Sequence, residues 1–398
     1  MAPSWSELPS ELLGVVFLNL RCLADRVYFA AVCRSWRSAA AARALASPPT
    51  PLPQQLPWLL LVPSDGAPCF VSLLAGSARR RLSLPYGAHG ARLCGSHAGG
   101  WLAVAANGWR AYALVNVFSR AWLPLPDRMR VPRHGINTCL VVRAVALSAP
   151  PTSRDCIAAA IVSGVSNLAF VRPRMDRQWL ASETVHGLQD VLYHDDELVR
   201  GFHAVTNDEA VTVFVQEGDP GAPALRMAWR SYRMQRRSNA PAPSPSSSSG
   251  GGVSRYLVES RGKLLMVVRH FPSVVQHGGG GGAATAHGFE VLELGVQALP
   301  SGDHVAWWVE LDGGLDGRVL FLARGCSRAF EASQFAGFQE GVYFLDDTSF
   351  DISLALSSGG NFPCSDVGWY SGREVMRGVK GFPSEFQSTF SPPTWFYP

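Results

Sequence analysis

The feature of this sequence that most constrains its fold is a long series of short β-type runs that begins near Trp58. Because no long helical segment separates these runs, they predict an all-β architecture, which could be a sandwich, a barrel or a propeller. At roughly 40 to 50 residues per four-stranded blade, residues 55–398 would supply about six to eight blades, so the length favours a propeller. Turn-forming Gly, Pro, Asn or Asp residues punctuate the runs, examples of which are Trp101 to Ala105, Ala111 to Val117, Cys139 to Val145, Ile157 to Val162 and Ala210 to Val215.

The first 46 residues follow a helical period instead. A first helix is expected from Ser10, behind Pro9, because the apolar residues that follow recur at helical spacing. A second is expected near Ala24 and Asp25, and a third carries Trp36 into an Ala-rich stretch that Pro48 ends. We therefore predict a three-helix domain over residues 1–47, a Pro-rich linker over 48–57 that acts as a stiff spacer, and a β domain over 58–398.

Two low-complexity segments interrupt the predicted β domain. Residues 238–252 are rich in Ser, Pro and Gly, and residues 277–287 contain a run of Gly. Neither has the apolar content to order itself, so both are expected to be mobile insertions. The Arg-rich segment Arg226 to Arg237 precedes the first of them. It is typical either of a solvated strand edge or of a nuclear-localisation or anion-binding patch, and the sequence leaves both interpretations open.

Composition narrows the compartment and the class of partner. The chain is 47% hydrophobic and 17% charged, with a formal net charge of +4, which does not indicate binding to nucleic acid or to a membrane surface. No apolar run approaches the roughly 20 residues that span a bilayer, and no secretion signal is recognised. The eight cysteines are scattered without metal-binding spacing, so we expect buried free thiols and a cytoplasmic or nuclear protein.

The segment from Trp5 to Ala40 resembles the F-box in its residue types and their order, including a Val-Cys-x-x-Trp-Arg signature from Val32 to Arg37. The resemblance implies binding to a Skp-type adaptor and, through it, to the cullin of a ubiquitin ligase. A short helical trio buries too little apolar surface to be very stable alone, which suits a role in which it offers an apolar face to a partner. The motif places seven residues at or beside that interface, namely Leu8, Pro9, Leu12, Leu13, Val32, Cys33 and Trp36.

The alternative for part of this set is an internal role. Leu13 and Val32, together with Val16 and Phe17, could instead form the core of the three helices. Cys33 is not expected to be a catalytic or metal-binding thiol, because no His or second Cys lies at suitable spacing.

The remainder of the chain resembles plant F-box proteins with a C-terminal KIB-type β-propeller domain. This resemblance implies a propeller, but the insertions near residues 238–252 and 278–282 depart from the family pattern, so loop-borne specificity cannot be transferred. The segments that carry it are Leu93 to Val104, Tyr256 to His270, Phe289 to Leu294, Trp307 to Phe330, Gly341 to Asp347 and the closing PPTWFYP.

The residue patterns that could suggest catalysis or metal binding have plainer structural explanations. In the cluster from His194 to Glu197, adjacent side chains on a strand point to opposite faces, so a solvated acidic turn is preferred over a metal site. Asp346 and Asp347 follow an apolar run and are interpreted as a strand-end turn. The Gly run at 278–282 lacks the Lys-Ser/Thr of a phosphate loop. No catalytic residue, cofactor or metal is predicted.

The sequence therefore favours a non-catalytic receptor subunit of an SCF-type cullin-RING ubiquitin ligase, with an unknown target protein bound by the β domain. An F-box scaffold or transcriptional regulator that acts without ubiquitin transfer is the main alternative. A propeller enzyme is a third, and would require polar residues that converge in the central channel.

Overall fold

The computed structural model describes most of the chain. The expected mobile insertions at 238–252 and 277–287 lie outside the described residues, apart from Gly252. The described ranges are residues 5–44, 54–64, 67–74, 78–106, 110–131, 136–139, 141–163, 167–195, 200–235, 252–271, 288–301, 303–311, 314–346, 362–363, 366–376, 382, 387–388 and 391–398.

The predicted three-helix segment is confirmed. A 3-10 turn, η1 (Trp5–Glu7), precedes α1 (Ser10–Asn19), α2 (Leu23–Val32) and α3 (Arg34–Ala44). Pro9 is the N-cap of α1, and its carbonyl accepts the first helical hydrogen bond from Leu13 N–H at 3.1 Å. The helices share a small core, in which the rings of Phe17 and Phe29 lie 5.4 Å apart.

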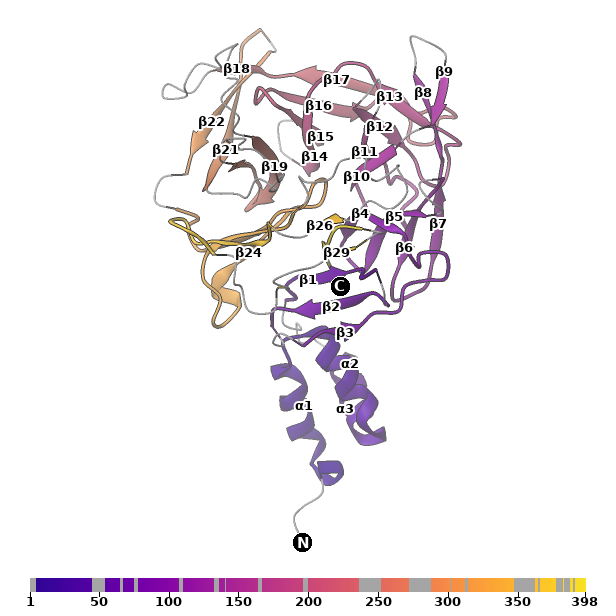
Figure 1. The fold of residues 1–398 in the computed structure, drawn as a ribbon, viewed down its shortest axis with the longest axis vertical. Coiled ribbons are helices and arrows are strands. Elements are labelled where there is room, and N and C mark those ends of the chain that lie inside the picture. The colour runs from indigo at the N-terminus through magenta and orange to yellow at the C-terminus, as the bar shows by residue number, and fades with distance from the viewer. Residues whose placement is uncertain are drawn as a thin grey trace, which may run out of the picture.

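The β domain is a propeller, as predicted, and its six main sheets place it at the lower end of the expected six to eight blades (Figure 1). Blade 1 orders β30 (Thr394–Phe396), β1 (Trp58–Leu61), β2 (Cys69–Ser72) and β3 (Arg80–Arg81). Blade 2 orders β4 (Arg92–His97), β5 (Trp101–Ala106), β6 (Ala111–Asn116) and β7 (Trp122–Leu125). Blade 3 orders β10 (Val141–Leu147), β11 (Ala158–Ser163), β12 (Leu168–Val171), β13 (Trp179–Ser182), β8 (Arg128–Val131) and β9 (Ile136–Cys139).

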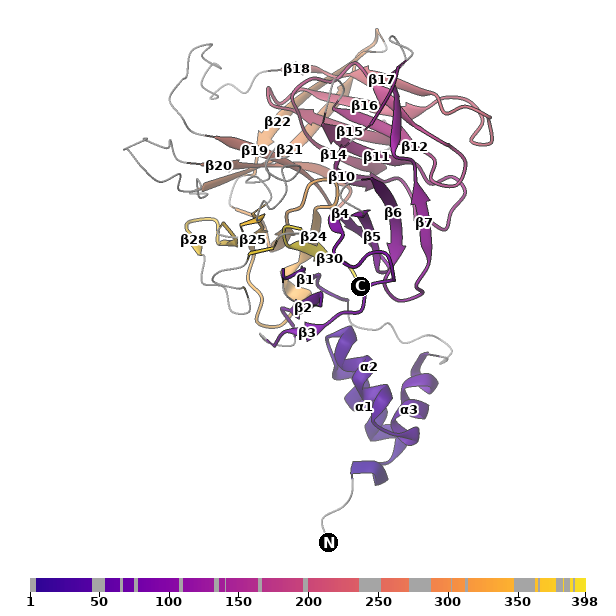
Figure 2. The ribbon, with the colours of Figure 1, turned by 45° about the vertical axis from the view of Figure 1, so that its right-hand side comes forward.

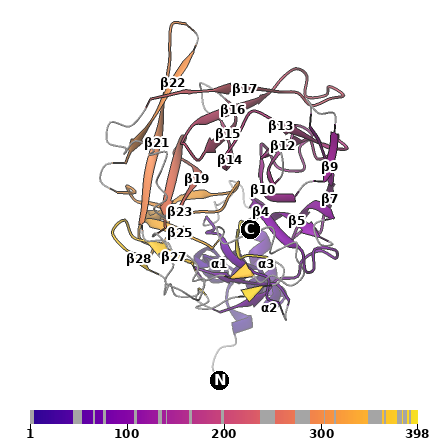
Figure 3. The same ribbon diagram turned by 45° about the horizontal axis from the view of Figure 1, so that its top comes forward.

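The other three blades complete the ring, seen from a second direction in Figure 3. Blade 4 orders β14 (Leu188–Asp195), β15 (Arg200–Thr206), β16 (Val211–Gln216) and β17 (Met227–Ser231). Blade 5 orders β19 (Val253–Ser260), β20 (Lys263–His270), β21 (Gly288–Ala298), β22 (His304–Glu310) and β18 (Arg233–Gln235). Blade 6 orders β24 (Arg328–Glu331), β23 (Arg318–Phe321), β25 (Gly341–Phe344), β27 (Gly368–Tyr370) and β28 (Val375–Met376); a separate ribbon pairs β26 (Phe362–Pro363) with β29 (Gln387–Ser388).

The ring is closed by strands from the two ends of the β domain. In blade 1, β30 pairs antiparallel with β1, with Trp58 opposite Phe396 and Leu60 opposite Thr394. Trp395 is fully buried, and its indole N–H donates to the Leu322 carbonyl at 3.0 Å. The PPTWFYP segment is therefore part of the structure that holds blade 1 to blade 6.

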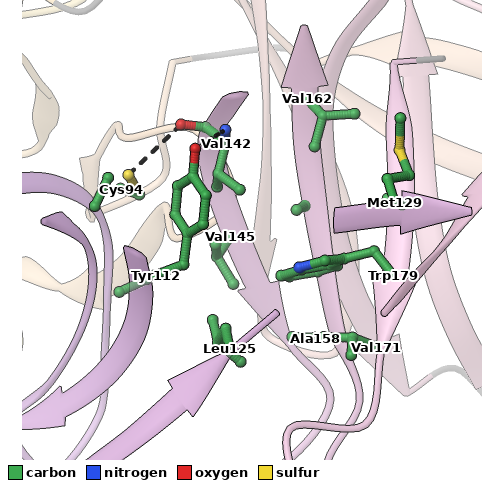
Figure 4. Packing of buried hydrophobic residues seen from close by; sticks show 14 of the residues in the cluster. Cys94, Tyr112, Leu125, Met129, Val142, Val145, Ala158, Val162, Val171 and Trp179 are labelled. Carbon is green, nitrogen blue, oxygen red and sulfur yellow. Dashed lines mark hydrogen bonds between the residues drawn. The ribbon is translucent and has the colours of Figure 1, made fainter. Parts of the chain in front are cut away.

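Neighbouring blades pack through apolar faces. Figure 4 shows this between blades 2 and 3, where Tyr112 of β6 points toward Val142 of β10. The Tyr112 hydroxyl oxygen accepts a hydrogen bond from the Val142 N–H at 3.4 Å. Trp179 of β13 is fully buried in the same cluster, and its indole N–H donates to the Pro126 carbonyl at 2.8 Å. Burial on both faces explains why these strands read as nearly continuous apolar runs.

Two sequence expectations are refined by the strands. The run predicted from Cys139 to Val145 is divided, because β9 ends at Cys139 and β10 begins at Val141. The Arg-rich segment that starts at Arg226 contributes β17 and β18, whose Arg230 and Arg233 side chains are exposed at the outer edges of blades 4 and 5. This arrangement matches the interpretation as a solvated strand edge for the part that the structure describes.

The expected spacer between the two domains differs from the structure. The helices extend from the rim beside blade 1 (Figure 2), and Cys22 and Ala24 at the start of α2 are buried in the same apolar cluster as Leu60 of β1. Leu56, inside the predicted 48–57 linker, is 1% exposed and belongs to the propeller core. The two units therefore share a packed junction.

Polar contacts reinforce this junction. The Gln55 side chain accepts from Leu23 N–H and donates to the Arg21 carbonyl, each at 2.5 Å. Arg80 of β3 forms an ion pair with Asp25 of α2 at 2.7 Å. The orientation of the helices on the ring is thus set by packing and by specific contacts.

Candidate adaptor surface and propeller channel

The outer faces of α1 and α2 carry large apolar side chains that are exposed. Leu12 is 52% exposed and Val32 is 60% exposed, far above the exposure of the helical core. So many exposed apolar side chains on so small a helical unit are typical of a protein-binding site. The exposed set comprises Leu12, Val15 and Val16 on α1, and Val27, Tyr28 and Val32 on α2.

The residues predicted at the adaptor interface divide into three groups. Pro9, Leu12 and Val32 are exposed, while Leu8, Cys33 and Trp36 are half-buried. Leu13 is 1% exposed and lies in the core of the three helices, so its side chain does not reach the surface. This corrects its placement at the interface and agrees with the alternative core role, which also holds for Phe17.

Trp36 belongs partly to the core. Its ring lies 4.4 Å from that of Phe29, and its indole N–H donates to the Trp5 carbonyl at 3.1 Å. Truncation of Trp36 would therefore loosen the helices as well as remove surface, which makes it a poor probe of binding alone.

Val15 and Val27 were missed by the sequence motif. Helical spacing could have found Val15, which lies three residues after Leu12 and so shares its face of α1. It could not have found Val27, because a separation of five residues from Val32 does not place two side chains on one helix face. Tyr28 has a different role, because its ring lies 5.3 Å from the guanidinium of Arg80 at the junction.

The six cysteines whose side chains the structure describes are free thiols, as expected. Cys22, Cys94, Cys156 and Cys326 are buried, whereas Cys33 and Cys69 are half-buried. The Ser35 hydroxyl, 3.1 Å from the Cys33 sulfur, lowers the pKa of that thiol.

A second candidate site lies along the propeller axis. A loop, residues 322–327, which we call the plug, lies against the inner strands β10 and β14, and its Arg324 guanidinium lies 5.1 Å from the Tyr256 ring of β19. Gly325 N–H donates to the Asp190 carboxylate at 2.7 Å, and the Tyr397 hydroxyl donates to the Cys326 carbonyl at 2.8 Å. The plug is therefore fastened to blade 4 and to the C-terminal segment.

Gly325 is required by the plug for two reasons. Its φ of +73° is a conformation that residues with a side chain rarely adopt, and an added Cβ would lie 3.0 Å from the Val145 carbonyl carbon and oxygen. The backbone of the plug thus passes directly against β10.

Asp190 is fully buried beside the plug. It accepts hydrogen bonds from the backbone N–H groups of Val191, Leu257 and Gly325, at 2.9, 2.9 and 2.7 Å. Burial raises the pKa of Asp190 to about 7, against the opposing effect of these donors and of Arg324. A single carboxyl group therefore joins blade 4, blade 5 and the plug.

Small cavities lie on both sides of the plug. One, of about 60 Å³, opens where the inner strands begin and is lined by Arg92, Arg143 and Arg324. The other, of about 230 Å³, opens where they end and is lined by polar side chains that include His97 and Glu259. Burial, and next the charge of Arg328, lower the pKa of His97 to about 3, so this imidazole is neutral.

The cluster from His194 to Glu197 separates as strand geometry requires. His194 faces inward, with a ring nitrogen 3.9 Å from the Glu259 carboxylate, while the exposed Asp195 pairs with Arg200 at 3.3 Å. The expected solvated turn is wrong for His194, which is 2% exposed because β14 extends through it. Asp196 and Glu197 lie outside the described residues.

Asp346 also differs from a solvated turn. It follows β25 as predicted, but it is 2% exposed and accepts the Asp366 N–H at 3.3 Å. Asp347 and the Gly run at 278–282 lie outside the described residues. In the described ranges, no group of three or more His, Cys, Asp or Glu residues is arranged to hold a metal ion. None of the helices in those ranges has both the length and the apolar character needed to span a bilayer.

Comparison with known proteins agrees with this architecture. Residues 70–371, well over half of the chain, match the model of the KIB1-4 beta-propeller family. A stretch of 39 residues is 51% identical to an F-box/kelch-repeat protein of Arabidopsis thaliana and covers 10% of each chain. The matched segment thus spans about a tenth of that relative's length.

A solved structure was also found, namely the PQQ-bound form of aldose sugar dehydrogenase from Streptomyces coelicolor. It is 13% identical and covers 80% of this chain and 96% of its own, with a TM-score of 0.23. At that score the likeness carries no argument about fold or chemistry. The extent of the family match, together with the six blades, shows that this chain belongs to the KIB1-4 β-propeller family.

Proposed function

We propose that this protein is the substrate-recognition subunit of an SCF-type cullin-RING ubiquitin ligase. Its helices would bind a Skp-type adaptor and, through it, the cullin, while the propeller would bind a target protein. In this role the chain performs no chemistry itself and brings a target to the ubiquitin-transferring machinery.

The observation that carries the proposal is the exposed apolar surface on α1 and α2. Leu12 and Val32 are more than half exposed, although the same helices bury Leu13 and Phe29 in a small core. Exposing such side chains is unfavourable in water, and an apolar partner surface would bury them. The junction with blade 1 supports the same role, because a fixed orientation would hold a bound target at a constant position relative to the adaptor.

Adaptor binding is tested by charging this surface without disturbing the core. We expect the double variant Leu12→Lys/Val32→Lys to lose at least about 2 kcal/mol of binding free energy per residue, or about 30-fold in Kd each. Binding of purified full-length chain to a Skp-type adaptor would be measured by calorimetry, with circular dichroism to confirm the fold. Val309→Lys is the matched control, since Val309 is an exposed valine on blade 5.

The outcomes separate the possible roles. Unchanged adaptor affinity in the double variant would refute the assignment of this surface. If the intact chain bound the adaptor but supported no ubiquitin transfer to any protein it captures in a reconstituted ligase, a scaffold or regulatory role would replace the receptor role.

A further inference from the structure

A groove follows the outer seam between blades 3 and 4, on the side of the ring opposite the helices (Figure 1). Two pockets form it, of about 440 and 200 Å³, and Leu180 of β13 lines both. We propose that this groove binds an extended acidic segment of the target protein, with one apolar side chain of that segment buried against the groove. The inference rests on the proposed function, because it names the part of the propeller that would hold the target.

The two walls of the groove are joined by a buried arginine. Arg172 follows β12 and is 2% exposed, and its Nη1 donates to the carbonyl oxygens of Pro220 and Ala222, at 3.0 and 2.7 Å. These carbonyls belong to the hairpin between β16 and β17. The Nη2 of Arg172 pairs with Asp176, in the turn before β13, at 2.7 Å. Walls fixed in this way form the groove before a partner arrives, which lowers the entropic cost of binding.

The groove offers apolar surface along its length. Leu180 of β13 and Leu225 of the facing hairpin are half-buried and line the larger pocket. Met175 in the larger pocket is 44% exposed, and Trp229 in the smaller pocket is 56% exposed. Aromatic residues and Met are enriched in protein interfaces, where they are buried by the partner. An apolar side chain of a bound segment would therefore gain a contact here.

The charge of the larger pocket selects an acidic partner. Arg130 of β8 and Arg177 of the turn before β13 line this pocket and are exposed. Neither guanidinium group forms a hydrogen bond or an ion pair with the residues that the structure describes. The acidic residue of the pocket, Asp176, is paired with Arg172, and residues 132–135 next to β8 include no acidic residue in the sequence. Carboxylates of a partner would therefore complement this end of the groove.

The smaller pocket has a different character. It contains Trp229 and one acidic residue, Glu183, and none of the described residues that line it is basic. A bound segment would thus place its acidic side chains at the larger pocket and its apolar side chain nearer Trp229. At about 3.3 Å per residue, the wall from Gln178 to Thr184 would accompany about six residues of an extended peptide.

The test is a selection of short random peptides, displayed on phage, against the immobilised full-length chain. We expect the wild type to enrich peptides that combine several Asp or Glu residues with an aliphatic or aromatic one. The same selection on Arg130→Glu/Arg177→Glu should lose that set, because like charges would then face each other. Arg233→Glu/Lys263→Glu, at two exposed positions of blade 5, changes the net charge equally and should keep the set.

Synthetic copies of the enriched peptides give the size of the effect by fluorescence anisotropy. We expect Arg130→Glu/Arg177→Glu to weaken binding at least about tenfold, and added salt to weaken binding to the wild type. Met175→Asp should also weaken it at least about fivefold, since it replaces an apolar contact by a like charge. Circular dichroism checks that each variant is folded. Enrichment of peptides without acidic residues, or equal affinity for the wild type and Arg130→Glu/Arg177→Glu, would overturn the proposal.

A second copy of this chain is the other occupant that the test separates. Analytical ultracentrifugation of the wild type would detect it, and dimers that disappear in Arg130→Glu/Arg177→Glu would assign the groove to self-association and overturn the proposal. Failure of the groove is distinguishable from failure of the proposed function. Leu12→Lys/Val32→Lys should retain peptide binding while it loses the adaptor, whereas a groove that binds no acidic peptide would leave adaptor binding intact.

Discussion

The side chain of Asp190 joins three parts of the propeller. Its carboxyl group receives N–H groups from blade 4, from blade 5 and from the plug, while burial favours its neutral form. Because the folded-state pKa of about 7 is higher than that of an unfolded aspartate, the folded chain holds the proton more tightly. The stabilisation that comes from this proton is complete below about pH 4 and is lost as the pH rises toward 7.

Replacement of Asp190 by Asn tests this behaviour, since the amide does not titrate. We expect the variant to be less stable, because an amide oxygen cannot accept all three donors. The stability difference between wild type and Asp190→Asn should shrink between pH 5 and pH 8 in urea-unfolding measurements. A difference that stayed constant or grew with pH would mean that Asp190 is ionised in the fold, and Asp195→Asn, at an exposed position, serves as control.

At the level of elements, the sequence predicted what depends on local pattern. The three helices were anticipated, and so were example strands such as Trp101 to Ala105 and Ile157 to Val162, because amphipathic spacing and turn residues act over a few positions. The bulges at Cys94, Arg143 and Gln189 and the path of the plug were not, because they depend on contacts between segments far apart in the chain. The burial of His194 was missed for the same reason.

The closing strand β30 provides a test at this scale. Trp395 is fully buried between blades 1 and 6, with its ring 4.9 Å from that of Phe321. We expect Trp395→Ala to lower the free energy of unfolding by about 3–5 kcal/mol, as large core truncations do. Differential scanning calorimetry would show this as a fall in Tm, while Trp229→Ala, at a side chain 56% exposed, should change Tm little. Equal effects of the two substitutions would contradict the closure described above.

For the whole molecule, the shared junction changes how the two halves can be separated. The sequence predicted a stiff spacer over residues 48–57, which would leave the helices and the propeller as separate units. In the structure, Cys22 and Ala24 cover part of the cluster that contains Leu60, and Asp25 pairs with Arg80. The sequence thus predicted that the candidate adaptor surface lies on the N-terminal helices. It did not predict that these helices pack against blade 1.

Truncation should therefore destabilise the propeller. We expect a chain that begins at Pro48 to show a lower Tm than the full chain. Removing the helices exposes apolar surface of the propeller to water, which costs about 25 cal/mol of folding free energy per Å². Thermal unfolding of the truncated chain would be compared with that of Leu12→Lys/Val32→Lys, which keeps the junction and should retain the wild-type Tm. Identical Tm values for the full and truncated chains would show that the junction contributes nothing to stability.

The pairing of β1 with β30 also fixes an order of events during synthesis. β1 leaves the ribosome early, but its partner follows every other strand that the structure describes. At about 5–20 residues per second, the interval between Leu61 and Thr394 lasts roughly 15 to 70 s. Throughout that interval the nascent chain carries an apolar strand edge at Trp58 and Leu60, which is the kind of surface that aggregates or recruits chaperones. The incomplete propeller therefore needs protection from aggregation until β30 has been synthesised and pairs with β1.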